Sequence, residues 1–110
     1  MIHSLVNQYY QTWNRNPLLL AGFYHKNAWI NVINSTHGYR VDPSQISNHS
    51  VMIGYINPSN VNVIFSDQNK CVVSVTGFTR YNKFIQTLTI TNNTQSLNRY
   101  YIVSDSLIFI

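Results

Sequence analysis

Acidic residues are almost missing from this sequence. It has no glutamate and only three aspartates, Asp42, Asp67 and Asp105, against seven lysines and arginines, which gives a formal net charge of +4. Charged residues make up 9% of the chain, against roughly 25% in ordinary globular domains. The basic residues are scattered along the chain and form no cluster, so direct nucleic-acid binding is not expected.

Cysteine is nearly absent too, since Cys71 stands alone. An internal disulfide and a cysteine-based zinc site are therefore excluded. The four histidines, His3, His25, His37 and His49, lack the spacing of metal ligands, and neither a metal nor a cofactor is expected. No apolar run approaches the ~18 residues that span a membrane, and the N-terminus has no signal-peptide pattern. We expect a protein of the cytoplasm and nucleus, without membrane association.

The chain contains enough apolar residues to form a hydrophobic core. Hydrophobic residues make up 45% and aromatic residues 14% of its 110 residues, which excludes a disordered chain. That length fits one domain, spanning residues 1–110, and neither a repeat nor a linker interrupts it.

The first half of the chain reads as mostly helical. Apolar residues recur at helical spacing over residues 2–13, and Asn16 followed by Pro17 predicts the start of a short helix that runs through Phe23. Residues 28–33 have the β-branched and aromatic content of a strand. A capping signature predicts a further helix over residues 43–53.

In the second half, apolar and polar residues alternate with period two, which predicts β-strands. Strands are predicted over residues 62–66, 70–79, 83–91 and 99–109, with turns at 67–69 and 92–94. Such short connections favour antiparallel pairing. Helices followed by a curved antiparallel sheet predict an α+β domain, with about three helices packed on one side of the sheet.

Alternation assigns each strand residue to one of two faces. The face expected to meet the helices carries Cys71, Val73, Val75, Phe84, Gln86, Leu88, Ile90, Tyr101, Val103, Asp105 and Leu107. The opposite face carries Val72, Ser74, Thr76, Phe78, Ile85, Thr87, Thr89, Tyr100, Ile102, Ser104, Ser106 and Ile108. This second face is too apolar for an ordinary solvent-facing sheet, which predicts that it meets a partner.

These segments resemble a known family. The pair Tyr9 and Tyr10 in the first helix, followed by Phe23 and Tyr24 at the end of a short one, is similar to the opening of nuclear transport factor 2-like domains. Residues 73–77, the Phe-x-Gln pattern at 84–86 and the closing residues 100–107 resemble the last three strands of that family. The resemblance covers most of the chain and is only general over residues 35–69.

The resemblance implies a cone-shaped fold whose outer sheet face pairs with a second such domain, as a homodimer or a heterodimer. It implies a non-enzymatic role in nucleocytoplasmic transport, in messenger-RNA export as the small partner of an export receptor, or in RNA granules, with a location extending to the nuclear envelope. The implied interface residues are Val72, Ser74, Phe78, Ile85, Thr87, Ile102, Ser104, Ser106 and Ile108.

Members of the family recognise Phe-containing segments such as the FG repeats of nucleoporins. The positions that match such a peptide groove are Leu5, Gln8, Phe23 and Leu107. The family's import factor also binds the small GTPase Ran through acidic residues. The matching stretches here, residues 30–32 and 79–83, contain no acid and include Arg80 and Lys83. Like charges would oppose association, which argues against Ran binding in the family's manner.

An enzyme is the alternative reading, because the fold also hosts isomerases and dehydratases with an acid inside the cone. Asp105 is the only carboxylate on the expected inner face of the sheet. A structural role, in which Asp105 accepts hydrogen bonds, is the interpretation we favour over catalysis.

Overall fold

The computed structural model describes residues 2–93 and 99–110. Its helices are α1 (Ile2–Arg15), η1 (Pro17–Phe23, a 3-10 helix), η2 (Pro43–Gln45, a 3-10 helix) and α2 (Ile46–Ile53). Its strands are β1 (Tyr24–Ile33), β2 (Gly38–Val41), β3 (Ile56–Ser66), β4 (Lys70–Thr79), β5 (Lys83–Asn93) and β6 (Arg99–Phe109). The turn predicted at 92–94 reaches beyond the described residues.

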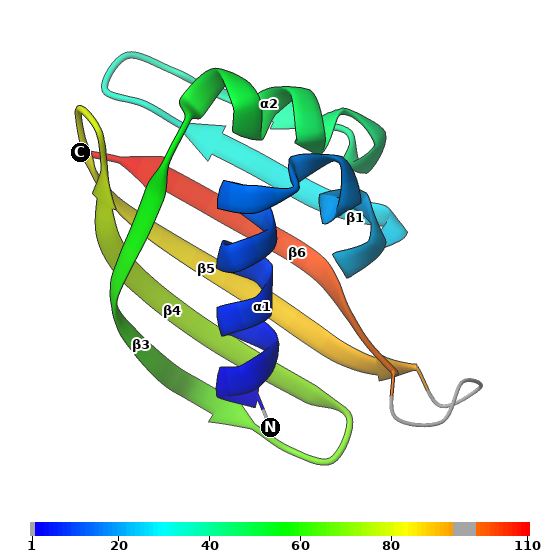
Figure 1. Ribbon diagram of the computed structural model, residues 1–110. Coiled ribbons are helices and arrows are strands. Elements are labelled where there is room, and N and C mark those ends of the chain that lie inside the picture. Colours follow the sequence, from blue (N-terminus) through cyan, green and yellow to red (C-terminus); the bar gives the residue numbers. More distant parts are fainter. Residues whose placement is uncertain (1, 94–98) are drawn as a thin grey trace.

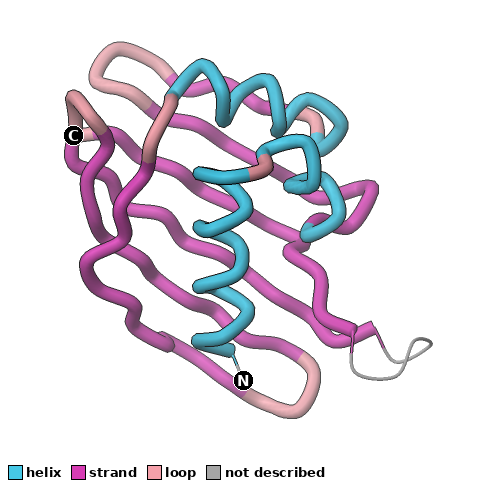
Figure 2. The backbone as a smooth tube through the Cα atoms, viewed as in Figure 1, coloured by secondary structure: helices cyan, strands magenta, loops and turns pink. Residues whose placement is uncertain are grey.

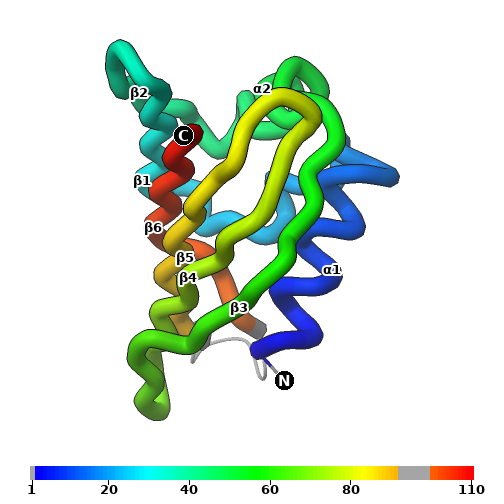
Figure 3. Tube along the Cα trace, turned by 90° about the vertical axis from the view of Figure 1, so that its left-hand side faces the viewer, coloured from blue at the N-terminus to red at the C-terminus, as the bar shows by residue number. Residues whose placement is uncertain are grey.

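All six strands form one curved sheet with the order β2-β1-β6-β5-β4-β3. The helices cover its concave face, and α1 runs across the middle of that face (Figure 1). From the side, all the described helices lie on this one side of the sheet (Figure 3). The expected α+β fold, with about three helices on the concave side of a curved sheet, is confirmed. The expectation of a purely antiparallel sheet is wrong for one pair, because β1 and β6 run parallel.

Helix α1 forms and docks because one of its faces is apolar. Val6, Tyr9, Tyr10 and Trp13 are all buried against the sheet, and burial of each such side chain contributes about 1.5–3 kcal/mol. The C-terminal end of α1 is fixed to the start of β3 by a pair of hydrogen bonds. The Asn14 side chain donates to the Ile56 carbonyl (2.8 Å) and accepts from the Ile56 N–H (2.9 Å).

Several boundaries differ from the sequence prediction. Strand β1 begins at Tyr24 rather than at residue 28, and the short strand β2 was not predicted. Strand β3 begins at Ile56 rather than at residue 62, although it contains Pro58. Because β3 lies at the sheet edge, the N–H that proline lacks is not required there. Figure 2 shows how much of the backbone these strands occupy.

A bulge in β6 corrects the predicted face of several residues. Thr89 pairs with Ser104 but the next residue, Ile90, pairs with Ile102, so Val103 is an extra residue in β6. Such an insertion reverses the alternation on one side of it. Ile102 is therefore 2% exposed in the core. The prediction that it lies on the outer face is wrong.

The same bulge explains the remaining errors on this strand. Tyr100, expected on the outer face, packs against the core, whereas Tyr101 and Val103, expected inside, are only half-buried. Beyond the bulge, Asp105 and Leu107 are buried as predicted. The other predicted inner residues are buried as well: Cys71, Val73, Val75, Phe84, Gln86, Leu88 and Ile90.

Candidate functional site

A chain of polar side chains crosses the core beneath α1. Tyr9 and Tyr10 come from α1, Tyr24 from β1, Gln86 from β5 and Asp105 from β6. The Tyr24 hydroxyl donates to Asp105 Oδ2 (2.7 Å) and lies 2.6 Å from the Tyr9 hydroxyl. The Gln86 amide donates to Asp105 Oδ1 (2.9 Å) and to the Tyr9 hydroxyl (3.2 Å). The Tyr10 hydroxyl donates to Gln86 Oε1 (2.6 Å).

The donors and acceptors in this chain balance. Tyr24 has a single hydroxyl hydrogen, which Asp105 accepts, so Tyr9 is the donor in the bond between the two phenols. Gln86 uses both amide hydrogens, one on Asp105 and one on Tyr9. Each hydroxyl and amide hydrogen therefore has an acceptor, and the network satisfies itself without an outside ligand.

Burial controls the ionisation of this network. It raises the pKa of Asp105 to about 6, although the hydrogen bonds from Tyr24 and Gln86 act in the opposite direction. Burial also raises the pKa of Tyr9, Tyr10 and Tyr24 well above the ordinary value, and the nearby Asp105 carboxylate adds to this effect. The three phenols thus stay neutral donors at physiological pH, while Asp105 titrates close to neutrality.

The Asp105 carboxylate is closed to a substrate in this conformation. Asp105 is 2% exposed and Gln86 is fully buried. Both carboxylate oxygens already accept a hydrogen bond, and Tyr9 of α1 joins the network from the helix side. Access of a substrate to this acid would require these side chains to move.

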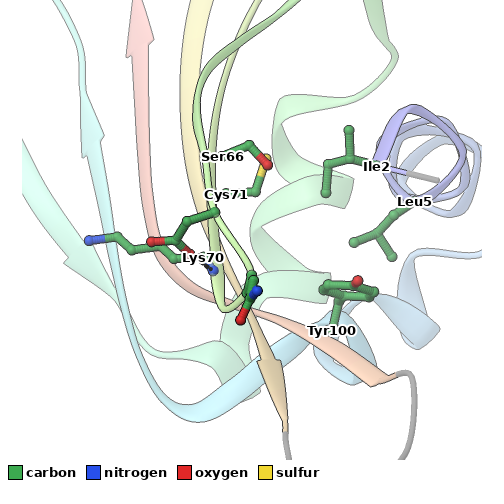
Figure 4. A pocket seen from close by; sticks show the side chains of 8 residues that line it. Ile2, Leu5, Ser66, Lys70, Cys71 and Tyr100 are labelled. Atoms are coloured by element: carbon green, nitrogen blue, oxygen red, sulfur yellow. Dashed lines mark hydrogen bonds between the residues drawn. The ribbon is translucent and has the colours of Figure 1, made fainter.

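An open cavity of about 250 Å³ lies instead between the N-terminal end of α1 and the β3–β4 hairpin. In Figure 4, Ile2 and Leu5 face Cys71 and Ser66 across it, and Tyr100 lies below. Burial raises the pKa of the Cys71 thiol, and a hydrogen bond with Ser66 opposes this effect. The thiol is therefore not activated as a nucleophile, and the cavity is suited to an apolar side chain.

The four predicted peptide-binding residues do not share one groove. Leu5 is half-buried and lines the cavity just described. Gln8 is exposed on α1, and Phe23 is half-buried with its ring edge-on to Tyr9 at 5.6 Å between centroids. Leu107 is 2% exposed and belongs to the core. Its predicted place in a peptide groove is wrong, because a residue of the inner sheet face under the helices cannot reach a peptide.

The outer face of the sheet presents most of the predicted interface residues. The half-buried or exposed ones are Val72, Ser74, Phe78, Ile85, Thr87, Ser104, Ser106 and Ile108. Strand register groups them into rows across the sheet. Ser74, Thr87 and Ser106 form a row of hydroxyls, and beside it Ile85 pairs with Ile108, which in turn pairs with Ile33 of β1.

Sequence reasoning missed the contribution of β1 to this face. Trp29 and Ile33 are exposed there, at 50% and 39%, while Ala28, Ile30 and Val32 are buried. The alternation of apolar residues along this segment indicates a strand with two faces. The sequence does not show that this strand lies beside β6, so these residues could not be assigned to the outer face.

The structure was compared with known proteins. No family model matches the chain, and no curated protein matches its sequence. Solved structures do match. The yeast UBP3-associated protein BRE5 superposes with a TM-score of 0.75 at 17% identity, over 99% of this chain and 93% of that one. Nuclear transport factor 2 from Cryptosporidium parvum superposes with a TM-score of 0.73 at 20% identity, over 98% and 90%. The chain has the nuclear transport factor 2-like fold.

This fold serves proteins of different kinds. A candidate ketosteroid isomerase from Parabacteroides distasonis also superposes, with a TM-score of 0.66 at 11% identity, over 99% of this chain and 85% of that one. The nuclear transport factor 2-like fold alone therefore leaves both binding and catalysis open, and the side chains must decide. In the part of the chain that the structure describes, no helix has the length and apolar character that crossing a membrane requires.

Proposed function

We propose that this protein is a non-enzymatic binding module of the transport-factor type, which pairs with a second nuclear transport factor 2-like domain through the outer face of its sheet. It also accepts Phe-containing peptides of the FG-repeat type. The observation that carries the proposal is the uncovered outer face, where Ile33, Ile85 and Ile108 adjoin a row of hydroxyls.

The chemistry of the outer face suits a partner better than water. The three isoleucines provide an apolar centre, and the neighbouring Ser and Thr hydroxyls can each donate and accept a hydrogen bond. An apolar centre with adaptable polar groups around it is typical of protein interfaces. Such a face suits a second copy of this chain or a related domain on another chain.

The closed state of the inner carboxylate supports a role without catalysis. A general acid or base must come within hydrogen-bond distance of its substrate. Both oxygens of Asp105 are instead occupied by Tyr24 and Gln86. We therefore assign Asp105 to the interior framework of the fold.

The cavity beside Leu5 is our proposed site for the phenyl ring of a peptide. Ile2, Leu5 and Tyr100 give it apolar walls, and its lining also includes the polar Ser66 and Gln68 and the charged Asp67 and Lys70. Its volume of about 250 Å³ accommodates one aromatic side chain. Recognition of this kind depends on aromatic burial and not on charge.

The pairing is tested by the mass in solution. The wild-type chain should scatter light at twice its 12.8 kDa, and Ile85→Glu should return it to the monomer because a buried, unpaired charge opposes the interface. The matched control is Val51→Glu, at an exposed position of α2, which should stay dimeric. If the wild-type chain is a monomer, the result would instead favour a heterodimer, in which this chain is the small partner of an export receptor. Dimers of both variants would refute the sheet-face interface.

Peptide binding is tested separately with a fluorescein-labelled FG-repeat peptide. Leu5→Asp should abolish binding, and Gln8→Ala, at an exposed position on the same helix, should leave it intact. A peptide in which Ala replaces Phe should not bind. Equal binding of the Phe and Ala peptides would refute the site.

A further inference from the structure

Strand β2 ends the sheet and has a partner on one side only. It pairs with β1, through Ile30 with Val41 and Val32 with Tyr39, and no strand within residues 2–93 and 99–110 follows it in the sheet order. An edge strand of this kind presents unpaired N–H and C=O groups that can accept a further strand. Its free edge is therefore a potential binding site for extended backbone.

The turn that precedes β2 determines which main-chain groups are free. The Asn34 N–H donates to the His37 carbonyl (3.0 Å), which makes these two residues a hydrogen-bonded pair. Bonded and non-bonded pairs alternate along an antiparallel ladder. Tyr39 and Val41 therefore bond to β1, whereas the N–H and C=O groups of Gly38 and Arg40 point to the open edge.

A groove of about 310 Å³ runs along this edge, between β2 and α2. Tyr39 and Val41 lie on its strand side, and Gln45, His49 and Met52 of the neighbouring helical segment lie on the other. Arg40, Asp42 and Asn48 line it as well. The Tyr39 hydroxyl lies 2.7 Å from His49 Nε2, which fixes the distance between the two walls. Burial lowers the pKa of His49, which favours its neutral form. The part of the groove beside Tyr39, Val41 and Met52 can therefore take apolar side chains.

The other side of β2 carries a positive charge held in a fixed position. Arg40 pairs in register with Asn31, whose neighbours Ile30 and Val32 are buried, so Arg40 lies on the outer face. Its guanidinium stacks 3.8 Å above the centre of the Trp29 ring. Among residues 2–93 and 99–110, no carboxylate forms an ion pair with Arg40. Asp42 accepts hydrogen bonds from Ser44, and the Arg40 charge is the smallest of the causes that shift its pKa, which is lowered.

We propose that the free edge of β2 binds a short extended peptide segment that has an acidic residue opposite Arg40 and an apolar residue on each side of it. Directly opposite residues of an antiparallel pair project to the same face, so the acid would meet the guanidinium. Its two neighbours project to the other face, into the groove against Tyr39, Val41 and Met52. This site goes beyond the proposed function and requires neither the sheet-face dimer nor the cavity beside Leu5.

The probe is the labelled peptide Thr-Val-Asp-Val-Thr, acetylated and amidated at its ends, and its binding is measured by fluorescence anisotropy. We expect it to bind roughly three- to tenfold more tightly than the matched peptide with Lys in place of Asp. Arg40→Glu should reverse this preference, whereas Arg15→Glu, at the end of α1, should leave it unchanged. Equal binding of the two peptides to the wild type would overturn the assigned charge pairing.

A backbone modification of the peptide tests the strand pairing without any change to the protein. N-methylation of the Asp removes the N–H that would bond to the Arg40 carbonyl, so binding should be lost. N-methylation of the following Val blocks an N–H that points away from β2, so binding should persist. The amide resonances of Gly38 and Arg40 should shift on titration. Equal effects of the two methyl groups, or unchanged resonances, would refute the site.

A second copy is the competing occupant of the same edge. If these two amide resonances shift with protein concentration in the wild type and in the Ile85→Glu variant alike, copies of the chain pair through β2, and the peptide site is overturned. Concentration-independent resonances in Ile85→Glu, together with the peptide-induced shifts, support it. The Ile85→Glu variant also separates this outcome from a failure of the sheet-face dimer.

Discussion

The hydroxyl of Tyr24 lies 2.7 Å from Asp105 Oδ2 and 2.6 Å from the Tyr9 hydroxyl, so a single phenol joins the first helix to the last strand. A hydrogen bond to a charged acceptor is stronger than one between neutral groups. These bonds are therefore strongest when Asp105 is ionised, although burial of the carboxyl opposes that ionisation.

Burial disfavours the charge of Asp105 more than the hydrogen bonds from Tyr24 and Gln86 favour it, which predicts an unusual effect of pH on stability. The pKa of Asp105 is raised to about 6 in the folded chain, above its ordinary value of 3.8. Between these values the folded state binds more protons than the unfolded state, so the stability from this group is full below about pH 3.8 and is lost as pH rises through 6. The loss amounts to about 3 kcal/mol.

Urea unfolding of the wild type and Asp105→Asn between pH 4 and pH 7 measures this contribution. The stability difference between the two should change in favour of the variant as the pH rises, since Asn carries no charge. Taking a difference cancels the opposite effect of His49, whose pKa burial lowers. A difference that is constant over this range would contradict the assigned ionisation.

Tyr24→Phe should destabilise the fold by roughly 1–3 kcal/mol, because it leaves the Tyr9 hydroxyl without its acceptor and Asp105 with one donor fewer. It should also raise the pKa of Asp105 further, since the lost bond favoured the ionised form. Thermal unfolding measures the first effect and NMR titration of the carboxyl the second. The control is Tyr81→Phe, at an exposed turn position, which should change neither.

Ile102→Glu should prevent folding, whereas Ile108→Glu should prevent only dimerisation, although the two residues lie on one strand. The first places a charge in the core and should cost more than about 4 kcal/mol, enough to prevent folding. The second lies on the outer face and should fold while failing to dimerise. Circular dichroism and light scattering distinguish the two. A folded Ile102→Glu would contradict the bulge at Val103.

Asn14→Ala should cost about 1–3 kcal/mol, because it leaves both main-chain groups of Ile56 without their partner. Asn7→Ala, at an exposed position of the same helix, should be nearly neutral. Chemical unfolding of both variants gives the comparison, and equal midpoints would show that the contact between α1 and β3 adds no stability.

Local periodicity predicted most of the helices and strands, although not β2, and it did not predict the non-local pairing of the strands. The alternation over β4 and β5 placed Gln86 on the inner face, and the helical spacing of α1 placed Tyr9 and Tyr10 there. Their meeting with Asp105 depends on which strands are neighbours, and β1 beside β6 is a pairing over some 75 residues with no local signature. The sequence does not indicate the bulge at Val103 either. The residues around it are apolar on both faces, so one extra residue does not change the apolar pattern.

The buried polar network was likewise predicted only where local patterns were sufficient. Asp105 was correctly placed inside the fold, but its phenol partner Tyr24 was expected only as part of a helix end. The groove beside β2 could not be foreseen, because β2 itself is four residues long and lies in a stretch rich in turn-forming residues. Short edge strands take their structure from the neighbour they pair with more than from their own sequence.

The position of β6 also affects the order of events during synthesis. This strand is made last, yet it lies between β1 and β5 in the middle of the sheet. Until residues 99–109 have left the ribosome, no strand hydrogen bonds join the hairpin of β1 and β2 to strands β3 to β5. The Tyr24 hydroxyl also lacks its acceptor, Asp105. The sheet is therefore completed only after β6 is made, and until then the edges of β1 and β5 that β6 covers are open to chaperones or to the same edges of another nascent chain.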